Sequence, residues 1–185
     1  KKVKEQKKIR IIGDYDIDGI QSTYILYCAL KRIGAEADYV IPHRIRDGYG
    51  MNEHLVTQAA EAGIDTILTC DNGISAIDQI HLAKELGMTV VVTDHHEVPY
   101  IEENGVRREK ISEADAIVNP KQEACQYPFK KLCGAAVAWK LVQVLYEQAG
   151  IPVSEADRFI ENAGFATVGD VMDLQGENRV LVKLG

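Results

Sequence analysis

The fold is decided by a short apolar strand that runs into an acidic turn, Ile9-Arg10-Ile11-Ile12-Gly13-Asp14-Tyr15-Asp16-Ile17-Asp18-Gly19. Residues 20–33 then place apolar side chains at helical spacing, and Gly34 stands where such a helix would end. A strand followed directly by a helix is the first half of a β-α-β unit. The segment therefore predicts the start of an alternating α/β fold.

The same unit recurs along the chain. Apolar, β-branched runs predict strands at residues 9–12, 37–41, 66–70, 89–93 and 116–118, and helical spacing at 52–62 and 75–86 separates them. Most of these strands are apolar throughout, as expected for a parallel sheet covered on both faces. The repetition predicts an α/β fold with a doubly wound, mainly parallel β-sheet flanked by helices.

The predicted domain organisation follows from composition. We expect residues 1–185 to form one domain, with a parallel core at about 1–120, a polar, irregular surface insertion at 97–115 and a helical portion at 132–185. In that portion, helices are expected at 133–148 and 154–162, the second capped by Ser154. The chain begins with Lys1 and breaks off in an apolar pattern, so we expect a truncated piece of a longer protein.

The bulk composition indicates a folded domain without a membrane segment. Hydrophobic residues make up 46% and charged residues 26% of the chain. No apolar run reaches the roughly 20 residues that span a bilayer. Four cysteines without C-x-x-C spacing fit a reducing cytoplasm. The net charge of −7 argues against a basic nucleic-acid surface, although carboxylates that bind cations would contribute to it.

Carboxylate and imidazole groups follow three of the predicted strands. They are Asp14, Asp16 and Asp18 after residues 9–12, Asp71 after 66–70, and His95 and His96 after 89–93. Because ligands of open α/β sheets bind beyond the carboxyl ends of the strands, we expect these side chains to meet. Hard divalent cations prefer such oxygen and nitrogen ligands, so the pattern predicts a metal centre.

Each motif also has a simpler structural interpretation. Asp71-Asn72-Gly73 is a common turn sequence, Asp18 could cap the next helix, and the histidine pair could be a surface feature. An EF-hand is excluded because its twelfth position is Ile25 instead of Glu and a strand precedes the loop. The register of all three motifs with successive strand ends favours the metal centre over coincidence.

Five motifs follow one another along nearly the whole chain. They are Gly13-Asp14-Tyr15-Asp16-Ile17-Asp18-Gly19, Asp71-Asn72-Gly73-Ile74-Ser75, Thr93-Asp94-His95-His96, Val118-Asn119-Pro120 and Ala166-Thr167-Val168-Gly169-Asp170-Val171-Met172. This ordered set resembles the motifs of the DHH phosphoesterases. The G-D-Y-x-x-D-G form of the first motif, the Asn-Pro pair after the insertion, and the segments Pro42-His43-Arg44 and Gly48-Tyr49-Gly50 are similar to the RecJ branch of that family.

This resemblance implies a site for two Mn²⁺ or Mg²⁺ ions, bridged by Asp71. One departure from the family pattern is Ile12, which stands where many members have His, so one ion lacks a ligand unless Asp14 substitutes. The implied catalytic residues are Asp71, His95 and His96, of which His96 faces the substrate phosphate. The implied metal ligands are Asp14, Asp16, Asp18, Asp71, His95 and Asp170.

Three side chains are candidates for contact with the substrate. Arg44 can offer a bidentate fork to a phosphate, or it can be a solvated surface residue. Tyr49 can stack on a base or sugar, or it can pack within its loop. Consecutive residues that leave a strand tend to point in opposite directions, so we expect His95 to face the metal and His96 the phosphate.

The function implied by the resemblance is metal-dependent phosphodiester hydrolysis. It points to a 5'-to-3' exonuclease that acts on single-stranded DNA in repair and recombination. The alternatives are a phosphoesterase for short oligonucleotides, cyclic dinucleotides or phosphoanhydrides, and a non-catalytic scaffold, which the intact acidic and histidine set disfavours. In the full-length protein, the resemblance implies a second domain after this one and a single-strand-binding protein or helicase as partner.

Overall fold

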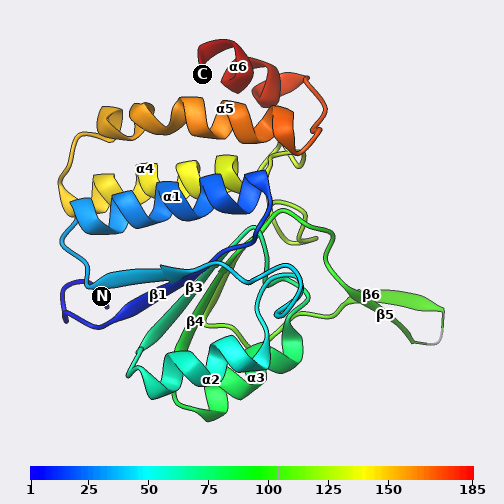
Figure 1. The fold of residues 1–185 in the computed structure, drawn as a ribbon. Coiled ribbons are helices and arrows are strands. Elements are labelled where there is room, and N and C mark those ends of the chain that lie inside the picture. Colours follow the sequence, from blue (N-terminus) through cyan, green and yellow to red (C-terminus); the bar gives the residue numbers. More distant parts are fainter. Residues whose placement is uncertain (104) are drawn as a thin grey trace.

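Five parallel strands form the central sheet, in the order β2-β1-β3-β4-β7 (Figure 1). The computed structural model describes residues 1–103 and 105–185. The predicted α/β fold with a mainly parallel sheet is confirmed, and each expected strand is present. The strands are β1 (Ile9–Ile12), β2 (Ala37–Val40), β3 (Thr66–Cys70), β4 (Thr89–Thr93) and β7 (Ala116–Val118).

Helices cover both faces of this sheet (Figure 1). On one face lie α2 (Glu53–Glu61) and α3 (Ile77–Glu85), which pack on Ile12 and Val90. On the other lie α1 (Ile17–Arg32) and α4 (Gly134–Ala149), above which α5 (Ile160–Gly169) and α6 (Gly176–Leu184) form a further layer. Ile11 and Ile12 point to opposite faces because side chains alternate along a strand.

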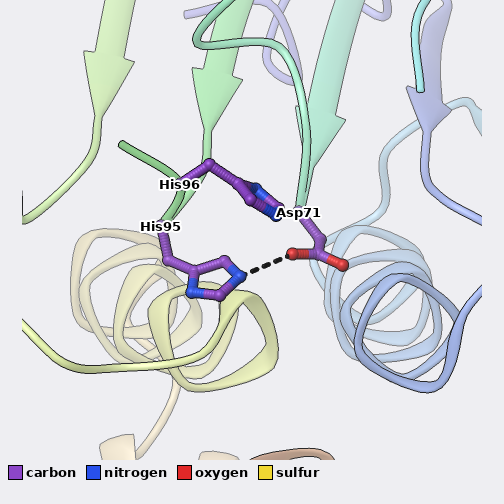
Figure 2. Close-up of side chains that lie close together, drawn as sticks. All are labelled: Asp71, His95 and His96. Carbon is purple, nitrogen blue, oxygen red and sulfur yellow. Dashed lines mark ion pairs between the residues drawn. The ribbon is translucent and has the colours of Figure 1, made fainter. Parts of the chain in front are cut away.

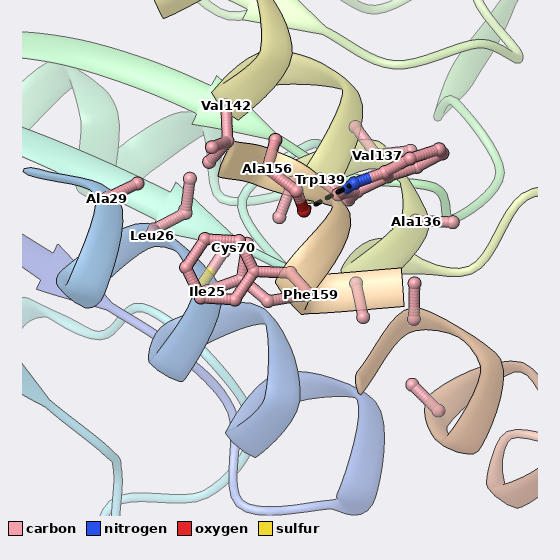
Figure 3. Packing of buried hydrophobic residues seen from close by; sticks show 14 of the residues in the cluster. Ile25, Leu26, Ala29, Cys70, Ala136, Val137, Trp139, Val142, Ala156 and Phe159 are labelled. Carbon is pink, nitrogen blue, oxygen red and sulfur yellow. Dashed lines mark hydrogen bonds between the residues drawn. The ribbon is translucent and has the colours of Figure 1, made fainter. Parts of the chain in front are cut away.

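The larger core lies between the sheet, α1, α4 and α5 (Figure 3). Ala136 is one of the small residues that α4 buries in this core, and the Phe159 ring packs 6.3 Å from the ring of Tyr24 on α1. The one buried polar group of Trp139, its indole N–H, donates to the carbonyl of Ala156 at 3.0 Å. This packing fixes the ends of α1 and α4 relative to the sheet, and both helices begin at its carboxyl edge.

Two local predictions are wrong. The insertion at 97–115 is not irregular: β5 (Tyr100–Glu103) and β6 (Val106–Glu109) form an antiparallel hairpin, in which the Arg107 guanidinium lies 3.4 Å from the Tyr100 ring centroid. Ser154 caps no α-helix, because Val153–Phe159 is a 3-10 helix (η1) that begins after Pro152. Among the described residues, no helix is long and apolar enough to cross a bilayer.

Candidate metal centre

The predicted ligands converge at the carboxyl edge of the sheet. Asp14, Asp71 and His95 come from the loops after β1, β3 and β4, and Asp170 comes from the end of α5. In three groups, the potential ligand atoms all lie within 4.8 Å of one another. These groups are Asp14, Asp16 and Asp71; Asp18, His95 and Asp170; and Asp71, His95 and His96.

The His95 ring approaches three carboxylates of this cluster, one of which, Asp71, is drawn beside it in Figure 2. Its Nε2 atom is 3.0 Å from Asp71 Oδ1, 3.5 Å from Asp18 Oδ2 and 3.7 Å from Asp170 Oδ2. The imidazole and two of the carboxylates are buried, and Asp170 is partly exposed. One nitrogen therefore faces three carboxylates at the point where the strand ends meet the helical layer.

Several buried polar atoms of the cluster lack a hydrogen-bond partner within the protein. They are Asp14 Oδ2, Asp71 Oδ1 and both ring nitrogens of His95. Asp71 Oδ1 and His95 Nε2 are close, but they do not meet hydrogen-bond geometry with each other. Buried polar atoms are nearly always bonded. Carboxylate oxygens and a neutral imidazole that converge on one position fit a divalent cation as their common partner.

The electrostatics of the cluster agree with this fit. Burial, together with the charges of Asp18 and Asp16, raises the pKa of Asp71 far above its ordinary range. The same causes raise the pKa of Asp170 to about 6. Burial lowers the pKa of His95, which favours the neutral form of its ring. Uncompensated negative charge is unfavourable here, and a cation would offset it.

The Asp71 backbone has a left-handed conformation, with φ 59°, which is rare outside glycine. Its N–H donates to the Thr93 carbonyl at 3.1 Å. The neighbouring Asn72 side chain donates to the carbonyls of Ile12, Gly13 and Cys70. These bonds tie β1, β3 and β4 together and offset strain of about 1–3 kcal/mol. The Asp-Asn-Gly motif is thus a fixed junction of three strands and not a simple surface turn.

The three aspartates of the first motif have different surroundings. Asp16 caps α1, since its side chain accepts the N–H of Gly19 at 2.9 Å. The alternative that Asp18 caps α1 is therefore wrong. Asp18 instead accepts from the backbone of α4. Asp14 accepts from the N–H of Gly50 at 3.2 Å and keeps its other oxygen unbonded.

The expectation that His95 and His96 point in opposite directions is wrong. Their ring centroids are only 4.5 Å apart, and both rings face Asp71 (Figure 2). The alternation rule fails because β4 ends at Thr93, before the pair begins. The rings still differ in their bonding. His96 Nδ1 lies 2.7 Å from Asp94 Oδ1 and His96 Nε2 lies 3.1 Å from the Tyr49 hydroxyl, whereas neither ring nitrogen of His95 has a hydrogen-bond partner in the protein.

Asp94 is a site residue that the sequence reasoning assigned no role. It accepts hydrogen bonds from the backbone N–H groups of Ile74, His95 and His96, besides its bond with the His96 ring. That ring bond is the main cause of the raised pKa of His96. Asn119 fixes the same loop, because its side chain donates to the His96 carbonyl at 3.0 Å. Asp94 and Asn119 both belong to motifs quoted from the sequence, and that membership is the sequence signal that could have indicated their roles.

Arg44 and Tyr49 lie at different distances from the cluster. The Tyr49 hydroxyl donates to the Asp71 carbonyl at 2.9 Å, which places this ring beside the ligands. The Arg44 guanidinium stacks 4.5 Å from the Tyr15 ring centroid. It lines a hollow of about 930 Å³ together with basic groups that include Arg46. The structure thus brings Tyr49 to the cluster and leaves Arg44 in a neighbouring hollow.

Comparison with known proteins agrees with this architecture. The model of the DHH family, N-terminal domain, matches residues 8–163, so the chain belongs to the DHH family. The single-stranded-DNA-specific exonuclease RecJ of Bacillus subtilis is 41% identical over 183 residues, covering 99% of this chain and 21% of that protein. The Escherichia coli RecJ is another curated relative, and this chain covers 32% of its length. The chain therefore spans no more than about a third of the length of the curated relatives it matches.

Two solved structures extend the comparison. Exonuclease RecJ bound to manganese superposes with a TM-score of 0.83 at 34% identity, covering 99% of this chain and 44% of that chain. RecJ from Thermus thermophilus in complex with Mn²⁺ gives a TM-score of 0.77 at 31% identity, covering 99% of this chain and 24% of that chain. The fold described above is thus shared with RecJ structures that contain manganese.

Proposed function

We propose that this chain is the catalytic domain of a metal-dependent single-strand-specific DNA exonuclease that degrades DNA from the 5' end in repair and recombination. Its relatives are named single-stranded-DNA-specific exonucleases, and two of the matching structures contain manganese. The free cysteines support a reducing cytoplasm as its compartment. A single-strand-binding protein or a helicase would be the partner of the full-length protein.

The proposed cations are Mn²⁺ or Mg²⁺, held in two adjacent positions. Asp71 would bridge them because it belongs to one ligand group with Asp14 and Asp16 and to another with His95, and its carboxylate, unlike an imidazole, offers two oxygens on one side. Ile12 is buried in the core beneath α2 and α3, so Asp14, with its unbonded oxygen, is the residue that replaces the histidine frequent in the family. One position would use Asp14 and Asp16, and the other Asp18, His95 and Asp170.

The protein groups around the cations would divide the remaining work. When bound, two such ions activate an attacking water and offset the charge that grows on the phosphoryl oxygens. His96, oriented by Asp94, would donate a hydrogen bond to a non-bridging phosphate oxygen. Tyr49 is about half exposed, its ring lies nearly perpendicular to that of His96, and it would position the terminal base or sugar. Arg44 would bind a phosphate further along the strand.

The observation that carries the proposal is the set of unpartnered buried atoms that face one another on Asp14, Asp71 and His95. The test is Mn²⁺-dependent release of nucleotides from end-labelled single strands, with a duplex of the same sequence as the control substrate. Strands labelled at either end report the polarity. Release that persists in EDTA, or equal rates on duplex and single strand, would refute the proposed activity.

A further inference from the structure

The N-terminus of α4 is built into the metal cluster. The N–H of Gly134 donates to Asp18 Oδ2 at 2.5 Å, and the N–H of Ala135 donates to Asp18 Oδ1 at 2.7 Å. The side chain of Cys133, the residue at the N-cap position, does not cap the helix, so the carboxylate of Asp18, 116 residues before Gly134, takes its place. The positive end of a helix dipole stabilises an anion at this position. Asp18 is therefore held at both oxygens by backbone that cannot rotate away.

Gly134 also sets the space available to Asp71. A Cβ added at position 134 would lie 2.7 Å from Asp71 Cβ, 2.8 Å from Asp71 Oδ1 and 3.0 Å from Asp71 Cγ. The first two separations are shorter than side chains tolerate, and the atoms concerned belong to a short, buried side chain on a strained backbone. Any side chain at 134 must therefore displace Asp71, or α4 and with it Asp18.

We infer that Gly134 is a positioning residue of the metal centre. Through its N–H it holds Asp18, and through its missing side chain it leaves Asp71 the space to face His95. One glycine thus couples two carboxylates that lie far apart in the sequence. This inference rests on the metal-binding part of the proposed function and not on the identity of the substrate.

The direct test compares Gly134→Ala with Gly150→Ala by calorimetry of Mn²⁺ binding. Gly150 ends the same helix with φ 71°, and no atom lies within 4 Å of a Cβ added there. Alanine at 150 therefore strains the backbone and lowers the melting temperature without touching the cluster. We expect Gly134→Ala to weaken Mn²⁺ binding about 10–100-fold, as for other residues that orient metal ligands. Unchanged Mn²⁺ affinity in Gly134→Ala would overturn the inference.

A second measurement needs neither metal nor activity. Asp71→Gly removes every atom that a Cβ at 134 would meet most closely, and glycine readily adopts φ 59°. In EDTA, Gly134→Ala should lower the melting temperature of the otherwise unaltered protein by several degrees, and that of the Asp71→Gly protein by much less. Equal losses in both backgrounds would sink the steric coupling. Neither the calorimetric nor the melting measurement uses nucleic acid. A negative result in the nuclease assay would therefore contradict the proposed function and leave the role of Gly134 unaffected.

Discussion

Replacing Asp71 with asparagine is expected to stabilise the metal-free protein at alkaline pH and to abolish its affinity for Mn²⁺. An aspartate in the unfolded chain has a pKa of about 3.9, whereas burial and the neighbouring carboxylates raise the pKa of Asp71 in the folded protein. Between these two values, the folded state holds one proton more than the unfolded state. The free energy of unfolding therefore falls as pH rises through this window, and asparagine removes that dependence.

The size of the effect follows from one proton. A difference of one bound proton changes the free energy of unfolding by about 1.4 kcal/mol per pH unit, so Asp71 accounts for at most about 3 kcal/mol between pH 7 and pH 9. His95 contributes little between pH 7 and pH 9, because its pKa is lowered in the folded protein and an unfolded histidine titrates mainly below pH 7. The slope that remains in the variant reports His96 and the other titrating groups.

Urea unfolding in EDTA at pH 7, 8 and 9, with the variant beside the unaltered protein, measures this difference. We expect the stability of the two proteins to diverge as pH rises, with Asp71→Asn the more stable. Parallel pH profiles would refute the reasoning, because they would show that Asp71 carries no extra proton in the folded state. Calorimetry supplies the second arm: one Mn²⁺ ion that still binds Asp71→Asn with unchanged affinity would refute the bridging role.

Three further predictions concern the histidine pair, Asp94 and the basic residues of the hairpin region. His95→Ala should lose Mn²⁺ affinity and His96→Ala should mainly lose turnover on a short single strand, and equal losses of Mn²⁺ affinity would show that the roles are divided wrongly. Asp94→Asn should lower turnover roughly tenfold or more, because the loop loses hydrogen bonds that orient His96, and a rate equal to that of the unaltered protein would count against this role. The basic residues of the hairpin region are Arg107, Arg108 and Lys110. Replacing all three with alanine should reduce the salt dependence of binding to long strands and leave the turnover of a dinucleotide unchanged. A collapse of dinucleotide turnover would contradict their peripheral position.

The fold was accessible to sequence reasoning because its signals are local. A strand such as β3 is apolar throughout and is followed by a turn and a helix, so its type can be predicted without knowledge of its neighbours. The hairpin β5–β6 was missed because its strands are exposed and highly charged, and charged residues favour a loop interpretation. The early start of α1 at Ile17 depends on the Asp16 cap, which sits inside a motif interpreted as metal-binding.

The sequence by itself determined which residue types follow each strand, and parallel strands deliver those residues to one edge of the sheet. That is why Asp14, Asp71 and His95 could be assigned to one site before any coordinates. Only the tertiary structure decided what each group contacts there. The bonds of Asp18 to α4 and the close fit of Gly134 against Asp71 join segments that are far apart in the chain. The bond of Asp94 to His96 depends on the backbone path after β4 ends. Such contacts arise from packing, and no local pattern in the sequence encodes them.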